Sequence, residues 1–273
     1  MFVYRSLLFV PGSRPDRFGK AVAAGADGVI IDLEDAVLPD DKAGARADTL
    51  AWLGAWRGHH LGLRINSPRT AAGCADLAAL AASGATARAD FLVVPKAETP
   101  VDLEIVAEAL GRRVPLIALI ESGRALSNAY AIAAKAAGGL MFGGVDFSAS
   151  LGADVSDWDA MLTARGTIAA ACAAAGAPAY DVPFLDTSDT DGLAASTRKA
   201  KAMGFAGRTC IHPGQVAPVN AVFTPSEAEI AEARAIIAAM DAAGSGAALF
   251  KGRMIDRPVI LAAERLLARY RPS

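Results

Sequence analysis

The strongest constraint on the fold is a strand-length apolar run that recurs eight times, each followed by a segment long enough for a helix. The runs lie at residues 6–10, 28–33, 61–65, 91–95, 116–120, 140–145, 179–184 and 208–211. Most are continuously apolar rather than alternating, as expected for strands of a parallel sheet that helices cover. This strand–helix period predicts a (β/α)8 barrel, the TIM barrel, rather than a doubly wound sheet.

The rest of the chain indicates an appendage on that barrel. A length of 273 residues is within the range of barrels of this class. We expect a barrel over residues 1–223 and a C-terminal helical extension, or lid, over residues 224–273. Within the extension we predict a helix over 224–243, a flexible link over 244–252 and a terminal helix that ends near Tyr270.

Composition limits the compartment and the partners. Hydrophobic residues make up 53% of the chain and the net charge is -2, so a large core can form and nucleic acids are not expected partners. No run approaches the roughly 20 apolar residues of a membrane helix. The first ten residues also lack the apolar segment and cleavage site of a signal peptide. Three widely spaced cysteines match no zinc or CxxC spacing, so we expect reduced thiols and a cytoplasmic protein.

Two carboxylates stand out because each follows an apolar run that reads as a buried strand. Glu121 comes directly after residues 116–120, and Asp146 directly after residues 140–145. Acidic side chains are rarely buried unless they are paired or bind a metal. Glu121 and Asp146 are therefore the first candidates for a metal pair, with a structural ion pair as the alternative.

Further polar residues follow the other strands, at the end of the barrel where active sites of this fold lie. Because side chains alternate along a strand, Asp32 and Glu34 should share one face and Asp35 should point the other way. Lys96 raises the possibility of a Schiff-base aldolase, which the nearby carboxylates disfavour. The polar residues in these positions are Arg14, Asp32, Glu34, Asp35, Arg64, Asn66, Lys96, Glu98, Asp181 and His212.

Eight short motifs, in order along the whole chain, carry a family resemblance. They lie at residues 6–13 (SLLFVPGS), 32–35 (DLED), 63–66 (LRIN), 94–96 (VPK), 120–122 (IES), 143–147 (GGVDF), 211–213 (IHP) and 254–256 (MID). Each motif alone is weak, but the ordered set is specific. The chain resembles the citrate lyase β-subunit and malyl-CoA lyase family within the HpcH/HpaI aldolase superfamily.

The resemblance implies a chemistry for the central residues. Glu121 and Asp146 match the family's Mg²⁺ ligands, and two carboxylates leave the room for water and substrate oxygens that Mg²⁺ prefers. Arg64 matches an arginine that faces the acyl group and can stabilise an enolate oxygen, although a plain Arg64–Glu34 ion pair is the simpler interpretation. Glu34 is the candidate for relaying protons or orienting a metal-bound water.

The resemblance also implies roles for residues nearer the two ends of the chain. Arg14 and Lys20 match positions that contact coenzyme A, with Phe9 beside it, while a solvated surface lysine is the alternative for Lys20. Asp256 matches an acid/base carried on a lid that closes over a neighbouring subunit's site. Without the resemblance, Asp256 would be interpreted as a turn residue before Arg257 and Pro258.

These residues predict a Mg²⁺-dependent carbon–carbon lyase acting on a 3-hydroxyacyl-CoA of the malyl-CoA or citramalyl-CoA type. Its products would be acetyl-CoA and glyoxylate or pyruvate. The main alternative is a true citrate lyase β-subunit, which would act on a citryl thioester of an acyl carrier protein in a complex. A non-catalytic thioester-binding barrel is disfavoured because all the expected polar residues are present. The family also implies a homo-oligomer, either a trimer or a hexamer.

Overall fold

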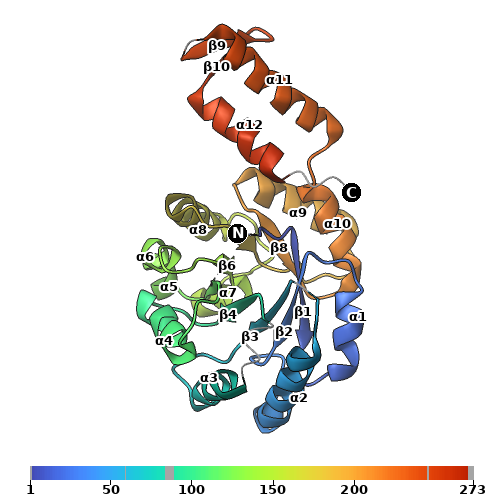
Figure 1. Ribbon diagram of the computed structural model, residues 1–273, viewed down its shortest axis with the longest axis vertical. Coiled ribbons are helices and arrows are strands. Elements are labelled where there is room, and N and C mark those ends of the chain that lie inside the picture. The colour runs from blue at the N-terminus through green and yellow to red at the C-terminus, as the bar shows by residue number, and fades with distance from the viewer. Residues whose placement is uncertain (1, 59, 84–88, 245, 270–273) are drawn as a thin grey trace. The chain divides into compact units, whose positions relative to one another are not determined.

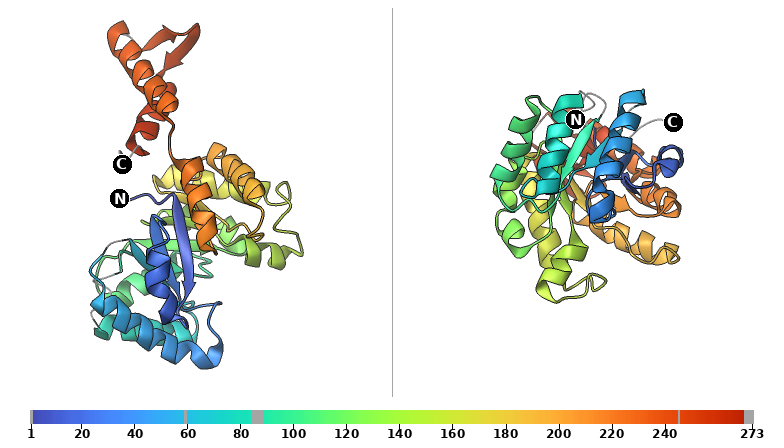
Figure 2. Two further views of the ribbon diagram at one scale, coloured as in Figure 1. Left: turned by 90° about the vertical axis from the view of Figure 1, so that its right-hand side faces the viewer. Right: turned by 90° about the horizontal axis from the view of Figure 1, so that it is seen from below.

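The computed structural model describes residues 2–58, 60–83, 89–244 and 246–269. The chain forms two compact units, Met1–Asn220 and Ala221–Ser273 (Figure 1). The first unit is a closed barrel of eight parallel strands that neighbour one another in sequence order, with helices around it (Figure 2). The predicted (β/α)8 barrel is confirmed.

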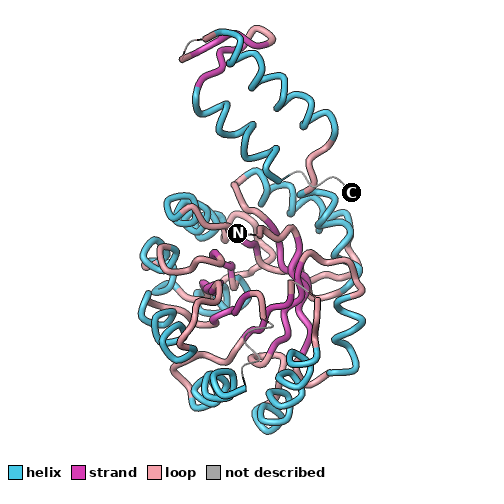
Figure 3. Tube along the Cα trace, in the orientation of Figure 1, coloured by secondary structure: helices cyan, strands magenta, loops and turns pink. Residues whose placement is uncertain are grey.

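The eight strands match the eight predicted apolar runs, with small differences at their ends (Figure 3). Strand β6 ends at Phe142, three residues earlier than predicted, because Gly143 and Gly144 lead into a helix. Strand β7 ends at Asp181, two residues before Pro183, which has no N–H to donate to a neighbouring strand. The strands are β1 (Ser6–Pro11), β2 (Gly28–Asp32), β3 (Leu61–Arg64), β4 (Phe91–Val94), β5 (Leu116–Ile120), β6 (Gly139–Phe142), β7 (Ala179–Asp181) and β8 (Gly207–Cys210).

Helices cover the outside of the barrel, and proline and glycine mark several of their ends. Thr99 and Asp102 form a capping box at Pro100, and Gly111 ends the same helix in the left-handed conformation. Short 3-10 turns lie at Pro15–Arg17, Pro39–Asp41 and Pro213–Gln215. The helices of this unit, some of them only one turn long, are α1 (Phe18–Val22), α2 (Lys42–Ala55), α3 (Ala71–Ser83), α4 (Pro100–Leu110), α5 (Gly123–Ser127), α6 (Ala129–Ala133), α7 (Gly144–Leu151), α8 (Leu162–Ala175), α9 (Thr190–Ala202) and α10 (Val216–Phe223), the last of which crosses the division between the units.

The barrel interior is filled by side chains from most of its strands. Its central cluster contains Tyr4, Leu7, Ile30, Phe91, Val93, Ile117, Leu119, Met141 and Tyr180, and Phe9 packs against it. Glycines on the strands make room for this packing. A Cβ on Gly62 would lie 2.2 Å from the ring of Phe91, so only glycine fits beside that ring as it stands. The packed interior leaves one end of the barrel for polar residues.

The second unit consists of α11 (Glu227–Ala243), α12 (Arg257–Arg269) and a β-hairpin between them. The flexible link predicted for residues 244–252 was wrong in part. Residues Ala247–Phe250 form β9, which pairs antiparallel with β10, Arg253–Asp256. Lys251 and Gly252 both have positive φ, the conformation of a two-residue hairpin turn, and Gly252 was the available sequence signal.

Two further points bear on this unit and on the chain as a whole. Asp256 is the last residue of β10 and pairs with Ala247, so it occupies a defined strand position. Within the part of the chain that the structure describes, no helix has both the length and the apolar character needed to cross a membrane.

A test of the barrel's packing is to replace Gly207 with alanine. A Cβ at this position would lie 2.0 Å from the Tyr4 carbonyl oxygen and 2.7 Å from that of Arg5, so backbone must move. We expect Gly207→Ala to lower the free energy of unfolding by about 1–3 kcal/mol. The measurement is urea denaturation followed by circular dichroism.

The matched control is Gly166→Ala, in the middle of α8, where a Cβ would meet nothing within 4 Å. Alanine is the better helix former, so this variant should be stabilised by up to about 1 kcal/mol. Equal stability of the two variants would contradict the packing described here.

Candidate active site

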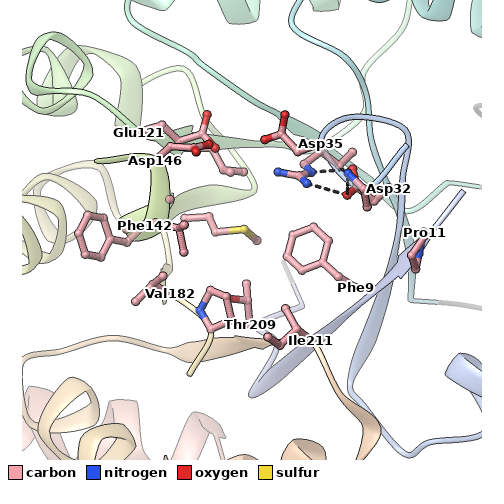
Figure 4. A pocket seen from close by; sticks show the side chains of 18 residues that line it. Phe9, Pro11, Asp32, Asp35, Glu121, Phe142, Asp146, Val182, Thr209 and Ile211 are labelled. Carbon is pink, nitrogen blue, oxygen red and sulfur yellow. Dashed lines mark hydrogen bonds and ion pairs between the residues drawn. The ribbon is translucent and has the colours of Figure 1, made fainter. Parts of the chain in front are cut away.

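A cavity of about 500 Å³ opens where the barrel strands end. In Figure 4, Asp32, Asp35, Glu121 and Asp146 lie along one side, and Phe9, Val182, Thr209 and Ile211 along the other. The cavity therefore has an acidic side and a mostly apolar side. Its lining comprises Phe9, Pro11, Asp32, Asp35, Ala36, Arg64, Leu119, Glu121, Met141, Phe142, Gly143, Gly144, Val145, Asp146, Val182, Pro183, Thr209 and Ile211.

Glu121 directly follows β5, and its side chain is held in place from two directions. Its Oε2 accepts a hydrogen bond of 2.7 Å from the backbone N–H of Lys96. A Cβ on Gly143 would lie 2.2 Å from Cγ of Glu121, so the glycine makes room for the carboxylate. The residue is only 5% exposed. Burial, reinforced by the neighbouring Glu34 carboxylate, raises the pKa of Glu121 to about 8.

Asp146 lies beside Glu121, but it is not at a strand end as predicted. It is in the first turn of α7, because the chain turns into a helix at Gly144. Both carboxylates line the cavity next to each other (Figure 4). The start of a helix is favourable for a negative charge. The two side chains therefore come from different kinds of element and still meet.

The Glu121–Asp146 pair fits a hard divalent cation such as Mg²⁺. Among the described residues, no three or more His, Cys, Asp or Glu side chains form a group that could hold a metal. A cage made only of protein ligands is thus not present there. Two carboxylates with open positions for water and substrate oxygens are what Mg²⁺ commonly uses. The Oε1 atom of Glu121 and the carboxylate of Asp146 are the oxygens that this pair offers to a cation.

Arg64 ends β3 and lies in the same cavity as the acidic pair. Its Nε and Nη2 donate to the two carboxylate oxygens of Asp32 at 2.7 and 2.6 Å, and Nη1 lies 2.9 Å from Glu34. Burial works against its charge, but the hydrogen bonds and charge of Asp32 raise the pKa of Arg64 further above its usual range. Its guanidinium also lies 5.1 Å from the ring centre of Phe9. Arg64 is therefore both ion-paired and part of the cavity lining.

The three acidic residues at the end of β2 have a different arrangement from the one predicted. Asp35 does not point away: it lines the cavity together with Asp32, whereas Glu34 lies between Arg64 and Lys96. Strand alternation does not extend this far because β2 ends at Asp32. Instead the Asp32 carboxylate accepts hydrogen bonds from the backbone N–H groups of Glu34 and Ala36, which forms a turn.

Burial raises the pKa of Glu34. For Asp35, burial acts in the same sense, but the hydrogen bond with Glu34 and the charge of Lys96 outweigh it and lower the pKa. The two neighbouring carboxyls therefore differ in proton affinity.

Lys96 is bound to acidic groups at both its backbone and its side chain. Its Nζ contacts Oε1 of Glu34 and lies 3.4 Å from Asp35. Although partial burial has the opposite effect, the hydrogen bond to Glu34 raises the pKa of Lys96 above its usual range. A Schiff-base nucleophile needs a neutral amine, so this environment argues against that mechanism.

The structure does not bring every predicted residue to the cavity. Phe9 is part of its wall, but Arg14 and Lys20 are exposed and do not line it. Arg14 forms an exposed ion pair of 2.8 Å with Asp16, and Lys20 lies on the one-turn helix α1. Asp256 belongs to the second unit.

Two other strand-end candidates have structural contacts. Asp181 faces Arg165 at 2.9 Å and Arg208 at 3.6 Å, where all three are buried, and it does not line the cavity. The Nδ1 atom of His212 accepts a hydrogen bond from the backbone N–H of Gly214, which fixes the turn after β8.

Sequence reasoning missed Lys42, whose ammonium supports the β2 end of the site. Its Nζ donates to the backbone carbonyls of Leu33 and Glu34 at 3.0 and 2.9 Å and to Oδ1 of Asn66 at 2.6 Å. Asn66 in turn donates to Asp76 on α3. A positive charge is unfavourable at the first position of a helix, and Lys42 is the first residue of α2. That unusual placement was the available sequence signal.

The comparisons with known proteins agree with this fold. A family model described as carbon–carbon bond lyase of the TIM-barrel fold matches residues 170–270; together with the family and the relative reported below, it places the chain among carbon–carbon lyases. A model described as HpcH/HpaI aldolase/citrate lyase matches residues 5–213. The chain belongs to the HpcH/HpaI aldolase/citrate lyase family, which confirms the resemblance found in its motifs.

Individual relatives make the likeness more specific. The chain is 37% identical to an L-malyl-CoA/β-methylmalyl-CoA lyase of Cereibacter sphaeroides, over 95% of this chain and 92% of that protein. It is 38% identical to a (3S)-malyl-CoA thioesterase of the same species, over 97% and 94%. Among solved structures it resembles CitE of Mycobacterium tuberculosis in complex with magnesium, acetoacetate and coenzyme A, with 35% identity, a TM-score of 0.81 and 98% of each chain covered.

The raised pKa of Glu121 predicts a dependence of stability on pH. In the folded protein Glu121 keeps a proton that the unfolded chain releases, so its contribution is present at low pH and is lost as the pH rises from about 4.5 to about 8. Without divalent cations, the melting temperature should fall more steeply between about pH 5 and pH 9 in the wild type than in Glu121→Gln, which cannot ionise.

Thermal melts monitored by circular dichroism at several pH values measure this difference. Adding Mg²⁺ should reduce the decline in the wild type and not in the variant, because a cation compensates the ionised carboxylate. Parallel pH profiles for the two proteins would contradict the assignment.

Proposed function

We propose that the protein is a Mg²⁺-dependent lyase that cleaves a 3-hydroxyacyl-CoA of the malyl-CoA or citramalyl-CoA type to acetyl-CoA and a 2-oxo acid, glyoxylate or pyruvate. The observation that carries this proposal is the Glu121–Asp146 pair in one cavity with Arg64. The likeness to a malyl-CoA lyase and to a CitE structure with magnesium and coenzyme A supports it.

Glu121 and Asp146 would hold the Mg²⁺ ion in this reaction. When bound, Mg²⁺ supplies Lewis acidity and a fixed positive charge for the hydroxyl and carboxylate of the 2-oxo-acid half. The apolar side of the cavity, with Val182 and Ile211, would pack against the remaining carbon skeleton. The cavity thus offers separate surfaces for the charged and the apolar parts of the substrate.

Arg64 would stabilise the other half of the substrate, the acyl thioester that becomes acetyl-CoA. Two of the five N–H groups of its guanidinium bind Asp32, so donors on Nη1 and Nη2 remain for a substrate oxygen. As the C–C bond breaks, its electrons move onto the thioester and form an enolate whose oxygen these donors can bind. A guanidinium already held in place needs little reorganisation when that charge develops.

Proton transfer would involve Glu34 and Asp256. The substrate hydroxyl loses its proton as the 2-oxo acid forms, and the enolate carbon gains one to become acetyl-CoA. We propose Glu34 as a relay on the barrel side, since it contacts both Arg64 and Lys96. Asp256, through its match to the family's lid carboxylate, is proposed as the acid/base at the enolate carbon, in its own or a neighbouring subunit.

Coenzyme A and assembly complete the proposal. Arg14, Lys20 and Phe9 are proposed to contact coenzyme A, and two exposed cations suit its phosphates. The assembly would be a homotrimer or homohexamer, and the compartment the cytoplasm.

The alternative is a citrate lyase β-subunit that acts on citryl-acyl carrier protein and gives oxaloacetate and acetyl-acyl carrier protein. It is supported by the likeness to a citrate lyase β-subunit of M. tuberculosis complexed with oxaloacetate and magnesium, at 35% identity and a TM-score of 0.72.

Identification of the products tests the proposal directly. Purified protein with Mg²⁺ is given malyl-CoA, citramalyl-CoA and β-methylmalyl-CoA, and the products are separated by liquid chromatography with mass detection. We expect acetyl-CoA with glyoxylate from malyl-CoA and acetyl-CoA with pyruvate from citramalyl-CoA; the same C–C cleavage of β-methylmalyl-CoA would give propionyl-CoA with glyoxylate. Free coenzyme A with the intact hydroxy acid would instead show a thioesterase, as one relative is named. Activity that appears only on a carrier-protein thioester would favour the citrate lyase alternative.

Substitutions at the site give a second test. Glu121→Ala and Asp146→Ala should abolish turnover and lower Mg²⁺ affinity, measured by calorimetric titration. Arg64→Lys should lower kcat by about 100- to 1000-fold, because an ammonium cannot hold Asp32 and a substrate oxygen in the same geometry. Full turnover by both alanine variants would refute the metal assignment.

A further inference from the structure

Lys96 occupies a backbone conformation that lysine rarely adopts. It follows Pro95 in the turn after β4, and its φ is 51°, in the left-handed region where glycine and asparagine are preferred. Non-glycine residues held in this region are concentrated at functional sites, where other interactions compensate for the strain. The contacts of Lys96 provide such interactions.

The left-handed turn lets this one residue bind two site carboxylates in different ways. Its backbone N–H donates to Oε2 of Glu121 at 2.7 Å. Its side chain, 48% exposed, places Nζ against Oε1 of Glu34 and 3.4 Å from Asp35. Glu121 follows β5 and Glu34 follows β2, so Lys96 joins two distant parts of the barrel mouth.

We propose that Lys96 is a positioning residue, whose ammonium holds Glu34 in place beside Arg64 and keeps it from becoming a third carboxylate on the Glu121–Asp146 metal site. This inference rests on the proposed function. Glu34 is 4% exposed; Arg64 and Lys96 are the cations in contact with its carboxylate, and the carboxylates of Asp35 and Glu121 are close enough to act on it. Without the ammonium, the buried Glu34 carboxylate keeps Arg64 on one oxygen, and a divalent cation held by the nearby Glu121 becomes the natural partner for the other.

The inference predicts different effects of Lys96 replacement on Mg²⁺ binding and on turnover. In Lys96→Met the backbone N–H to Glu121 remains, while a positive charge near the carboxylates is lost. Mg²⁺ should therefore bind at least as tightly as to the wild type. Turnover should fall, because Glu34 is no longer held where the reaction needs it. If Lys96 served only to keep the fold intact, its replacement would lower Mg²⁺ affinity and turnover together.

The experiment compares Lys96→Met, Lys96→Gly and Lys96→Arg with the wild type. For the first two we expect kcat to fall by about 10- to 100-fold with KM within about threefold. The Mg²⁺ dissociation constant, measured by calorimetric titration, should be no larger for either variant than for the wild type. Lys96→Gly also removes the unfavourable backbone conformation, so agreement between the two variants assigns the effect to the ammonium. Lys96→Arg keeps the charge and should recover most of the loss.

Lys135→Met is the matched control, because Lys135 forms an exposed ion pair of 2.9 Å with Glu104 and does not line the cavity. It should leave both kcat and Mg²⁺ binding unchanged. The inference is overturned if kcat of Lys96→Met stays within about twofold of the wild type. It is also overturned if Lys96→Met loses Mg²⁺ affinity and melting temperature together, or if Lys96→Arg is no more active than Lys96→Met.

Failure of the proposed function would give a different result. In that case the wild type itself turns over none of the thioesters, and the role of Lys96 is decided by Mg²⁺ binding alone. Tighter binding by Lys96→Met supports the inference, and equal or weaker binding overturns it.

Discussion

An excess of negative charge at the barrel mouth is the constraint on which the rest of the site depends. The acidic groups at or beside the cavity are Asp32, Glu34, Asp35, Glu121 and Asp146, and the cations among them are Arg64 and Lys96. Buried carboxylates are costly without a counter-charge. Burial raises the pKa values of Glu34 and Glu121, with a smaller contribution from neighbouring carboxylates, and, against the effect of burial, the carboxylates around Arg64 raise its pKa. A divalent cation between Glu121 and Asp146 would be a further counter-charge.

The backbone supports this charge arrangement with interactions that periodicity does not reveal. Lys42 holds the carbonyls that follow β2, and a left-handed turn at Lys96 supplies an N–H to Glu121. Gly143 leaves space for the Glu121 side chain. These contacts join residues from 8 to 25 positions apart in the chain, beyond the reach of strand and helix periodicity. They explain why the barrel scaffold alone does not define the site.

The difference between local sequence patterns and contacts across the chain also explains what could be predicted from the sequence. The eight strands follow from local apolar runs and their spacing, so the barrel could be predicted without knowing any contact between residues distant in the chain. Asp146 was placed wrongly because the apolar run was read as strand past Phe142, and Asp35 because strand alternation was extended past Asp32, where the chain leaves the strand. The hairpin that ends at Asp256 was missed because its sequence signal is a single glycine in a two-residue turn. The roles of the site residues remain proposals that depend on family resemblance and chemistry.

Arg64 shows why a structural and a catalytic interpretation of one residue need not compete. The ion pair with Glu34, considered from the sequence as an alternative to a role in the site, is present, and Arg64 still lines the cavity. An arginine on a flexible chain loses side-chain entropy each time it orders around a substrate. Asp32 and Glu34 impose that order during folding, and they leave donors free on the guanidinium. The ion pairs are therefore the condition for Arg64 to act on a developing enolate, because they fix the geometry before the substrate arrives.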